Sequence, residues 1–596
     1  MSLAKQNFHT ILIPLLACIA LLLALSIDVA AQTRDDESKS AAPKTGALSG
    51  RVLNENGQPL SHATISITAP TALPQLRITF TDDGGKFQVS GLDALVYTVW
   101  ASVPSYVTTP REPDSMPTYY RIGDSVTISL LKGGVITGTV TSATGEPIVQ
   151  TEVRAILIRD GNGKAPAGPR FPIQRPTDDR GVYRIYGLAP GTYLVSAGGR
   201  GAYGYSINAY DTDAPTYAPS ATRDAAAEIL VRAGEETSGV DIRYRGEPGH
   251  AVSGIVNGPT LPNSQIYMTL TQVVNGVPQA SMFSFQLPSS KGFAFYGVAD
   301  GDYELIAQSR LGQGEMVASE PRRITVKGAD ITGLELFVKG LASISGHVTL
   351  ETSAAAECKN KRQPLFSETL LVARRSEKST AKDQSAFPNT FTQISPDKSG
   401  DFVLRNLGPG QFSLTVRFFA KYWYLRSLAR EATAVDPVTG RVGITNRPTD
   451  AARSGIDLKF GERVSGLTVT LAEGAASFRG AVKTATGESV PAKLYLYLAP
   501  AEKENAEDVL RFFITQVAAD GTFGINNLPP GRYWVLARVA ADHEPQSLSK
   551  LRAPEEADMR TQIRHATEGA KTAVEFKPCE NVSTFEFPFK NSLLKP

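Results

Sequence analysis

The sequence predicts an all-β protein, built as a tandem array of about five β-sandwich domains. Residues 177–197 have the two-residue alternation of apolar and polar side chains that is typical of β-strands, on both sides of a Pro-Gly turn. Degenerate copies of this stretch recur four more times, at a period of roughly 100 residues. The repeats lack helical periodicity, which favours tandem sandwiches over a solenoid or a propeller.

Length and composition fit several globular domains. At 596 residues the chain exceeds the size at which a single core stops growing, so it should split into domains. The 61 Lys and Arg residues nearly balance the 59 Asp and Glu residues, so the sequence predicts no nucleic-acid partner. Its 52 Gly and 38 Pro are spread along the chain, as expected for short strands joined by turns.

The first 31 residues have the features of a secretory signal peptide. Lys5 precedes an apolar run over 11–27, and small residues follow at 29–31. We expect cleavage and export to the periplasm, the cell surface or the exterior. The alternative is an uncleaved anchor, because the run is nearly long enough to span a bilayer, and the membrane would then be contacted only through this segment. Residues 32–45 are charged and contain proline, which predicts a flexible linker.

Five repeats follow the linker. Each opens with a short strand around a glycine and closes on another short strand. The predicted ranges are repeat 1 (46–132), repeat 2 (133–247), repeat 3 (248–339), repeat 4 (340–473, with a long insertion over 351–389) and repeat 5 (474–596, with a short helix). The opening glycines are Gly50, Gly138, Gly254, Gly346 and Gly480, and the closing strands are 126–130, 239–242, 333–336, 466–469 and 582–587.

Residues 177–197 and their copies are interpreted as β-hairpins that form the frame of each repeat. Each copy carries two aromatic residues ten positions apart, which we expect in the core: Phe87 and Tyr97, Tyr183 and Tyr193, Phe293 and Tyr303, Phe402 and Phe412, Phe523 and Tyr533. Four positions after the first aromatic stands a residue that tolerates a positive φ, namely Gly91, Gly187, Gly297, Asn406 or Asn527.

Two regions of each repeat vary in length. The first lies between the opening strand and the hairpin, and spans from 37 to 56 residues. In repeat 4 it holds the insertion 351–389, predicted to be exposed. The second variable region lies between the hairpin and the closing strand. In repeat 5 it predicts a helix, because Pro554 precedes Glu555 and Glu556, and Met559 and Ile563 are four apart.

Aromatic residues in the second variable regions are candidates for sugar binding, because exposed rings stack on sugar faces. They equally fit structural packing, since aromatic rings bury large areas. The candidates are Tyr203, Tyr205, Tyr210, Tyr217, Tyr422, Trp423 and Tyr424.

The repeats carry motifs that resemble the carboxypeptidase regulatory-like domain. These motifs are Ser/Thr-Gly-x-Val, a Gly-x-Pro turn, Asp-x-x-Gly-x-aromatic and Leu-x-Pro-Gly-x-Tyr, cleanest in repeat 2. The resemblance spans 46–589, although 93–95 and 299–301 depart from the Pro-Gly pattern. It implies a seven-stranded, prealbumin-like (transthyretin-like) sandwich related to starch-binding-like domains.

No catalytic constellation accompanies the motifs, so the sequence predicts a protein that is not an enzyme and needs no cofactor. His565 and Glu568 match part of a zinc motif, but no histidine follows them, and we predict no metal site. Turn acids could bind calcium, but Asp also suits turns for conformational reasons alone. They are Asp82, Asp83, Asp178, Asp179, Asp397 and Asp520.

Two covalent cross-links stay open at this stage. Cys358 and Cys579 are the cysteines that follow the signal peptide, and they either form one disulfide or stay free. Lys483 and Asn581 are the pair to check for an isopeptide bond, which some related sandwiches contain.

The leading hypothesis is a non-catalytic exported scaffold or binding protein. One alternative is binding of a polysaccharide through the aromatic loops, and another is an accessory chain of an envelope peptidase or a transport system. The partner would be a protein or polysaccharide of the cell envelope or exterior.

Overall fold

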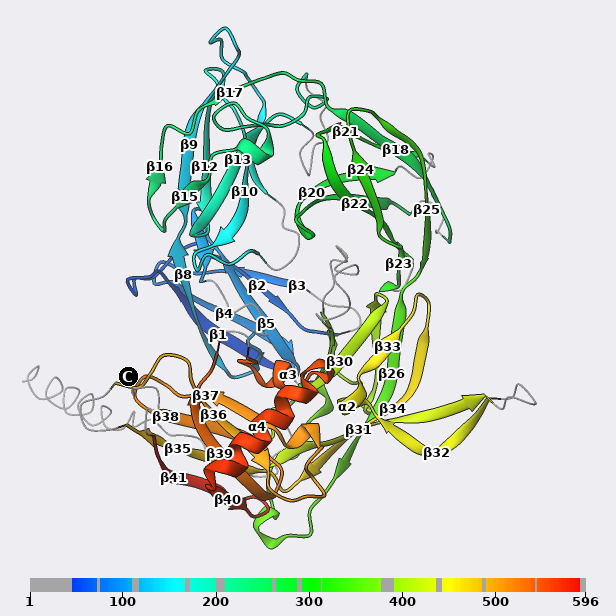
Figure 1. Cartoon of the computed structure of the whole chain (residues 1–596). Coiled ribbons are helices and arrows are strands. Elements are labelled where there is room, and N and C mark those ends of the chain that lie inside the picture. Colours follow the sequence, from blue (N-terminus) through cyan, green and yellow to red (C-terminus); the bar gives the residue numbers. More distant parts are fainter. Residues whose placement is uncertain are drawn as a thin grey trace, which may run out of the picture. The chain divides into compact units, whose positions relative to one another are not determined.

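The computed structural model describes residues 45–71, 76–109, 117–166, 172–199, 209–259, 264–286, 292–311, 314–376, 391–435, 442–484, 489–541 and 544–589 (Figure 1). The predicted signal peptide and all but the last residue of the linker lie outside this part. The described residues form mainly β-strands, so the predicted all-β class is confirmed. The repeat boundaries stay predictions, and the repeat numbers serve below as labels for the residue ranges.

Repeat 1 consists of two four-stranded sheets around one core. The first has the order β4 (Lys86–Asp93), β1 (Thr45–Leu53), β8 (Ser125–Lys132), β6 (Tyr106–Thr108). The second has the order β3 (Leu76–Phe80), β2 (Thr64–Thr68), β5 (Val96–Ser102), β7 (Tyr120–Arg121). The opening strand β1 lies between β4, which is antiparallel to it, and the closing strand β8, which is parallel to it.

Repeat 2 keeps this arrangement. Its first sheet contains β12 (Val182–Leu188), β9 (Gly134–Thr141), β16 (Glu236–Thr237) and β17 (Ile242–Arg243). Its second contains β11 (Ile173–Pro176), β10 (Glu152–Asp160), β13 (Gly191–Ala197), β14 (Thr216–Tyr217) and β15 (Ile229–Val231). The opening strand β9 again has an antiparallel neighbour, β12, and parallel neighbours, β16 and β17.

In repeat 3 the strands form one continuous sheet, because β23 pairs with both β22 and the closing strand. Its order is β20 (Val277–Gln286), β19 (Ile266–Val274), β22 (Gly301–Arg310), β23 (Met316–Ser319), β25 (Ile331–Gly340), β18 (His250–Asn257), β21 (Gly292–Val298), and β24 (Arg322–Val326) pairs with β22.

Repeats 4 and 5 return to two sheets each. In repeat 4 the first sheet has the order β29 (Asp401–Leu407), β26 (Ala342–Glu351), β34 (Arg463–Glu473), β31 (Trp423–Val435), β32 (Val442–Asp450). The second has the order β28 (Phe391–Ile394), β27 (Leu370–Arg375), β30 (Gly410–Arg417), β33 (Ile456–Leu458). In repeat 5 the first sheet has the order β38 (Thr522–Leu528), β35 (Ala476–Lys483), β41 (Asn581–Pro588). The second has the order β37 (Phe513–Gln516), β36 (Leu494–Pro500), β39 (Gly531–Val539), β40 (Ala573–Phe576).

The strand number differs from the seven that the resemblance implies. Within the described residues repeat 5 has seven strands, and the other four repeats have eight or nine. Several of the additional strands, such as β6, β14 and β23, come from the second variable regions.

Residues 177–197 do not form the predicted β-hairpin. β12 pairs with β9, whereas β13 pairs with β10, so the Pro190-Gly191 turn carries the chain from one sheet to the other. We call this two-strand unit the arch. Both strands of an arch direct alternate residues into one core, so the alternation in the sequence is the same as in a hairpin. All ten framing aromatics of the five arches are buried, with exposed fractions of 6% or less.

Each opening glycine faces the first aromatic of its arch across the antiparallel pair. The partners are Gly50 and Phe87, Gly138 and Tyr183, Gly254 and Phe293, Gly346 and Phe402, and Gly480 and Phe523. The residue four positions after this aromatic has a positive φ in all five arches, as predicted.

The prediction of an exposed insertion over 351–389 is wrong for part of that range. Residues 370–373 belong to β27 and are at most 2% exposed, in the centre of the second sheet of repeat 4. Polar flanks rich in Ser, Lys and Glu concealed this short apolar strand. Residues 377–390 lie outside the described part of the chain.

The predicted helix of repeat 5 is confirmed. A short 3₁₀ turn, Pro554–Glu556, leads into α4 (Ala557–Ala570), which lies along β36 and β39 (Figure 1). Ile563 on α4 packs with Tyr495, Tyr497 and Phe512 in a small core of its own. The other α-helices of the described residues are single turns, α2 (Ala451–Ser454) and α3 (Leu548–Leu551). None of these helices is long and apolar enough to cross a bilayer.

Candidate functional site

The second variable regions form the contacts between consecutive repeats. At each of the four junctions, a backbone N–H from the start of one repeat donates to a carbonyl in the second variable region of the repeat before it. These bonds run from Gly133 to Ser105 (2.8 Å), Gly249 to Thr212 (2.9 Å), Leu341 to Met316 (3.1 Å), and Gly474 to Tyr422 (2.8 Å). We call these four contacts the joints.

At the first two joints, the positive-φ glycine of the arch lies against the preceding repeat. A Cβ atom on Gly297 would lie 2.5 Å from the carbonyl oxygen of Asp211 and 2.7 Å from that of Asp213. Gly187 is looser, because a Cβ atom there would lie 3.9 Å from the Cα of Ser105. Glycine at 297 is therefore required both by the backbone conformation and by the approach of repeat 2.

At the last two joints, asparagine replaces glycine and its side chain makes the contact. The Asn406 side chain accepts a hydrogen bond from the Met316 N–H and donates to the Gly314 carbonyl, both at 2.9 Å. The Asn527 side-chain amide donates to the carbonyls of Ala420 (2.9 Å) and Trp423 (2.7 Å). Asparagine tolerates the positive φ and adds the hydrogen bonds that glycine lacks.

Gly91 occupies the same position in the arch of repeat 1, and nothing lies within 4 Å of a Cβ atom built on it. The sequence predicted the positive φ at this position from its fixed place in the arch. It did not predict that the position contacts a neighbouring repeat. The contact was missed because its other half lies in segments of different length and composition in each repeat.

The sugar-binding interpretation is wrong for three of the aromatic candidates, because their rings are buried. Tyr217 is 6% exposed, Tyr422 is 8% exposed and Trp423 is fully buried in the core of repeat 4. Tyr217 packs on Ile156 and Leu194, and Tyr422 packs beside Cys358 and Cys579. A buried ring has no free face on which a sugar could stack.

The other candidates have separate outcomes. Tyr210 is half-buried, and its ring meets that of Tyr244 edge to face at 5.5 Å. Tyr424 is also half-buried, and burial raises the pKa of its hydroxyl. Tyr203 and Tyr205 lie outside the described residues.

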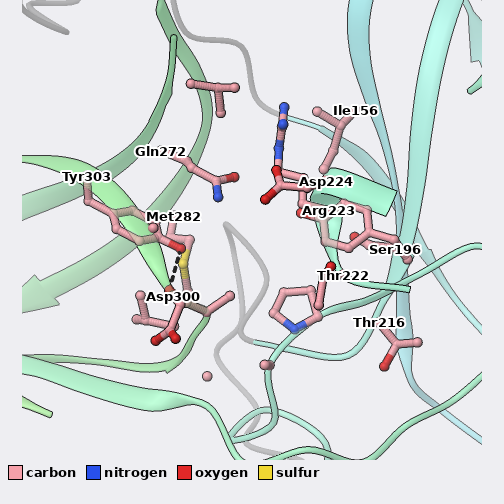
Figure 2. Close-up of a pocket in the computed structure, with 18 of the residues that line it drawn as sticks. Ile156, Ser196, Thr216, Thr222, Arg223, Asp224, Gln272, Met282, Asp300 and Tyr303 are labelled. Carbon is pink, nitrogen blue, oxygen red and sulfur yellow. Dashed lines mark hydrogen bonds between the residues drawn. The ribbon is translucent and has the colours of Figure 1, made fainter. Parts of the chain in front are cut away.

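A cavity of about 520 Å³ lies beside the joint of repeats 2 and 3. Figure 2 shows Gln272, Met282 and Tyr303 on the side of repeat 3, opposite Thr222 and Asp224 of repeat 2. Several charged groups in its wall already have hydrogen-bond or ion-pair partners. His250 lies 3.2 Å from Asp300, Arg245 donates to Glu247 at 3.0 Å, and Arg223 donates to Gln279. Such a wall suits a neutral, hydrogen-bonding ligand.

Two buried polar residues stand in the same wall. The Arg154 guanidinium donates to the carbonyls of Gly198 and Gly199, the latter at 2.7 Å, and burial lowers its pKa. Within the described part of the chain, the Ser196 hydroxyl is buried without a hydrogen-bond partner.

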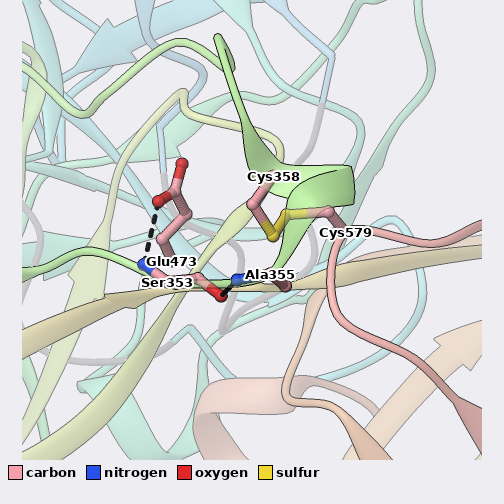
Figure 3. Close-up of a disulfide and its surroundings, with 5 residues drawn as sticks. All are labelled: Ser353, Ala355, Cys358, Glu473 and Cys579. Atoms are coloured by element: carbon pink, nitrogen blue, oxygen red, sulfur yellow. Dashed lines mark hydrogen bonds between the residues drawn. A yellow bond between two sulfur atoms is a disulfide. The ribbon is translucent and has the colours of Figure 1, made fainter.

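Cys358 and Cys579 form a disulfide between repeats 4 and 5, with their Cα atoms 5.4 Å apart (Figure 3). Cys358 ends a short 3₁₀ turn that begins after Ala355, and the Cys579 N–H donates to the carbonyl of Gly474 at the start of repeat 5. The bond therefore lies at the same joint that Asn527 secures.

The residues considered for metals are arranged differently from a metal site. His565 and Glu568 lie exposed on α4. Among the described residues, no three His, Cys, Asp or Glu side chains converge as metal ligands would. The turn acids instead accept hydrogen bonds from their own turns, as Asp178 Oδ1 does from the N–H groups of Arg180 (2.9 Å) and Val182 (2.8 Å).

The side chains of Asp82, Asp397 and Asp520 accept equivalent bonds, from the N–H groups of Lys86, Ser399 and Thr522. Asp83 and Asp179 stand exposed beside them. Asp82, Asp178 and Asp397 close the turn that leads into an arch in the same way, which supports the conformational explanation.

Lys483 and Asn581 do not meet. Lys483 pairs with Pro588 in the ladder of β35 and β41, and Asn581 pairs with Ser477, six residues away. At about 3.3 Å per residue this separation is roughly 20 Å. The Lys483 ammonium lies 3.3 Å from Glu586 and the Asn581 side chain accepts a bond from Ser477, so an isopeptide bond between the two is excluded.

Among solved structures, the chain resembles the Bacillus anthracis TIE protein at 16% identity, with 50% of this chain and 51% of that chain covered and a TM-score of 0.14. It resembles the shaft pilin SpaA from Lactobacillus rhamnosus GG at 13% identity, with 34% and 97% covered and a TM-score of 0.17. It also resembles the minor pilin GBS52 of Streptococcus agalactiae at 13% identity, with 36% of this chain and 99% of that chain covered and a TM-score of 0.18. No function follows from likenesses with such low TM-scores.

A comparison with curated proteins gives no match. The family model of the carboxypeptidase regulatory-like domain matches residues 47–116, within repeat 1, although the motifs are cleanest in repeat 2. The resemblance predicted from the sequence is thereby confirmed: this part of the chain matches the carboxypeptidase regulatory-like domain.

Proposed function

We propose that the protein is a non-catalytic, exported scaffold that holds its sandwiches in a fixed order and orientation. The observation that carries the proposal is the joint. Within the described residues, the start of each later repeat donates a backbone hydrogen bond to the preceding repeat at all four junctions, and at three of them the positive-φ residue of the arch also contacts that repeat closely. Domains joined by a simple linker move relative to one another by default. Joints built from backbone hydrogen bonds and close glycine contacts oppose that motion.

The joints differ in strength along the chain. The first is the loosest, since Gly187 makes no close contact with repeat 1. The last combines the Asn527 hydrogen bonds with the Cys358–Cys579 disulfide. A scaffold of this kind would be stiffest in its C-terminal half. A partner bound there would be held in a fixed orientation relative to repeats 4 and 5.

Small-angle X-ray scattering of the full chain tests the proposal. Gly297→Ala places a Cβ atom against the carbonyls of Asp211 and Asp213, so it should loosen the second joint and raise the radius of gyration and its spread. Gly91→Ala is the matched control, because Gly91 has the same backbone conformation but, among the described residues, nothing within 4 Å of its Cβ position. Equal scattering from both variants and the wild type would refute a function that depends on the joints.

Polysaccharide binding is the second candidate function, now through the cavity of Figure 2 instead of the buried aromatics. Its wall offers the amide of Gln272 and the carboxylate of Asp224, which can hydrogen-bond to a neutral sugar. Tyr217 and Tyr303 also line it, but both rings are buried and offer no face for stacking. A glycan array would test it. Binding that persists unchanged in Gln272→Ala, or no binding to any glycan, would contradict this candidate.

A further inference from the structure

A second cavity, of about 430 Å³, lies where residues of repeats 1, 4 and 5 meet. Most of its wall is apolar, and repeats 4 and 5 contribute the larger part of it. The apolar lining includes Leu370, Phe418, Phe419, Leu425, Leu510 and Phe513. Its volume falls in the range of sites that bind small molecules, roughly 300 to 1,000 Å³.

The wall on the side of repeat 1 is held by specific contacts. The Tyr119 hydroxyl donates to the side chain of Gln393 in repeat 4. Val96 and Tyr119 pack on Leu370, with Phe419 at the edge of this cluster. Each of these apolar residues is buried or partly buried, so the cavity is part of a packed interface and not a gap between separate surfaces.

The charged residues in the wall are all cationic. Arg417 and Arg552 line the cavity, and no Asp or Glu lies among its lining residues. The nearest carboxylates have other partners: Glu368 lies 3.8 Å from Arg121, and Asp508 lies 3.3 Å from Arg511. Asp508 also interacts with Arg552, so within the described residues the uncompensated charge of the wall is that of Arg417.

Arg552 is committed to the fold. Its guanidinium donates to the carbonyls of Phe512 (3.1 Å) and Leu510 (2.6 Å) and lies 4.5 Å from the centre of the Phe513 ring. Burial lowers its pKa to about 10, which reflects the cost of a cation that neutral groups solvate. Arg552 thus contributes positive electrostatic potential to the cavity but has little capacity for new hydrogen bonds.

Arg417 is the group that remains available. Within the described part of the chain its guanidinium makes no hydrogen bond and no ion pair, although it stands against Tyr119 and the apolar wall. Arg417 is exposed at the end of β30, so its guanidinium is accessible to a carboxylate, which accepts two parallel N–H bonds from it.

We propose that this cavity binds a monocarboxylate with an apolar tail, of the size of a medium-chain fatty acid. The carboxylate would pair with Arg417, and the tail would lie against Phe418, Leu425 and Leu510. Polyanions such as nucleotides fit poorly, because one guanidinium alone is available and the rest of the wall is apolar. Neutral sugars fit poorly because the wall offers few hydrogen-bonding groups. The inference is independent of the scaffold function.

Calorimetric titration of the full chain with decanoate, below its micellar concentration, tests the proposal. We expect saturable one-to-one binding of decanoate and none of decyltrimethylammonium, which has the same tail and the opposite charge. Arg417→Gln should weaken decanoate binding at least tenfold, and Arg417→Lys should recover part of it. Arg426→Gln is the matched control, since Arg426 is, like Arg417, an exposed arginine of the same repeat, but it pairs with Glu351 and does not line the cavity.

A second readout separates loss of the site from loss of the fold. Circular dichroism and the melting temperature of Arg417→Gln should equal those of the wild type, because Arg417 makes no hydrogen bond within the described residues. If that variant is unfolded, Phe418→Ala replaces it, with the same expected loss of affinity through the tail. The proposal is overturned if decanoate does not bind, if both amphiphiles bind equally, or if the folded variants bind decanoate like the wild type.

Discussion

Gly138 lies directly opposite Tyr183 in the antiparallel pair β9 and β12, and the position has no room for a side chain. A Cβ atom on Gly138 would lie 2.0 Å from the carbonyl oxygen of Val240 and 3.1 Å from the edge of the Tyr183 ring. The Tyr183 hydroxyl donates to this same Val240 carbonyl, so glycine, ring and closing segment form one contact. A Cβ atom built on Gly50, Gly254, Gly346 or Gly480 would likewise lie 2.0 to 2.2 Å from a closing-strand carbonyl oxygen.

Gly138→Ala should therefore destabilise repeat 2. Placing a methyl group in a packed core costs about 1 to 3 kcal/mol, and here the obstacle is backbone, which cannot turn aside. Hydrogen exchange of peptides from repeat 2 in the full chain measures the loss. Gly340→Ala is the control, because nothing lies within 4 Å of its Cβ position. Equal protection in both variants would contradict the argument.

Tyr183→Ala should cost about 3 to 5 kcal/mol, since the ring is 1% exposed and its removal leaves a cavity. Tyr183→Phe should cost about 1 kcal/mol, because it removes only the hydroxyl that donates to Val240. Denaturant unfolding followed by exchange in repeat 2 measures both. Tyr186→Ala, at a half-buried position of the same strand, should have the smaller effect, and a loss below 1 kcal/mol for Tyr183→Ala would show that the ring is dispensable.

The sequence was sufficient for the frame of each repeat because the frame is local. Alternation around Tyr183 and Tyr193 and the positive φ at Gly187 depend on near neighbours in the sequence. The position of Gly138 opposite the Tyr183 ring depends on strand pairing and was not predicted. Alternation could not separate a hairpin from an arch, since both direct Tyr183 and Tyr193 into one core. That distinction depends on the pairing of β12 with β9 and of β13 with β10, which is a tertiary property.

The candidate site was harder to predict because its parts are not local. Trp423 in a variable region looks like an exposed ring, yet it fills the core of repeat 4 while its carbonyl accepts a bond from Asn527 of repeat 5. Nothing in the residues around Trp423 specifies that partner. Arg417 likewise has no distinguishing motif, and its isolation from carboxylates emerges only when three repeats are placed together.

Asn406→Gly should weaken the third joint without disturbing the arch. Glycine keeps the positive φ of this residue but removes the acceptor for the Met316 N–H and the donor to the Gly314 carbonyl. Losing two such bonds should cost about 1 to 3 kcal/mol at the joint. Faster exchange of the Met316 amide, with unchanged exchange in the strands β26 and β29, is the expected result. Slow exchange at Met316 would show that the side chain is not its partner.

Removing the disulfide should loosen repeat 5 from repeat 4. The bond closes a loop with a sequence separation of 221, and loss of a native disulfide typically costs about 2 to 5 kcal/mol. Cys358→Ser with Cys579→Ser should lower the melting temperature of the C-terminal half and speed its proteolysis. Thermal unfolding of the full chain, with and without reductant, checks this. A double variant insensitive to reductant and as stable as the oxidised wild type would contradict the expectation.

The turn acids should make the arches sensitive to acid. Hydrogen bonds from the Arg180 side chain and the Val182 N–H lower the pKa of Asp178, and bonds from Ser399 and Thr522 do the same for Asp397 and Asp520. A depressed carboxyl pKa contributes stability above the unfolded value of about 3.9, and this is lost as the pH falls through the folded value. Asp178→Asn should reduce the pH dependence of repeat 2 between pH 4 and 2, measured by carboxylate NMR titration and acid unfolding.

The disulfide between Cys358 and Cys579 also decides how the chain would carry a pulling force. Tension applied at the two ends passes through the sulfur atoms, so residues 359–578 cannot be extended while the bond is intact. Most of repeats 4 and 5 are shielded in this way, whereas repeats 1, 2 and 3 would lengthen as they unfold. In the oxidised molecule, the N-terminal half can therefore extend under force, whereas the C-terminal half has a fixed maximum length. Reduction of the disulfide would allow residues 359–578 to extend as well.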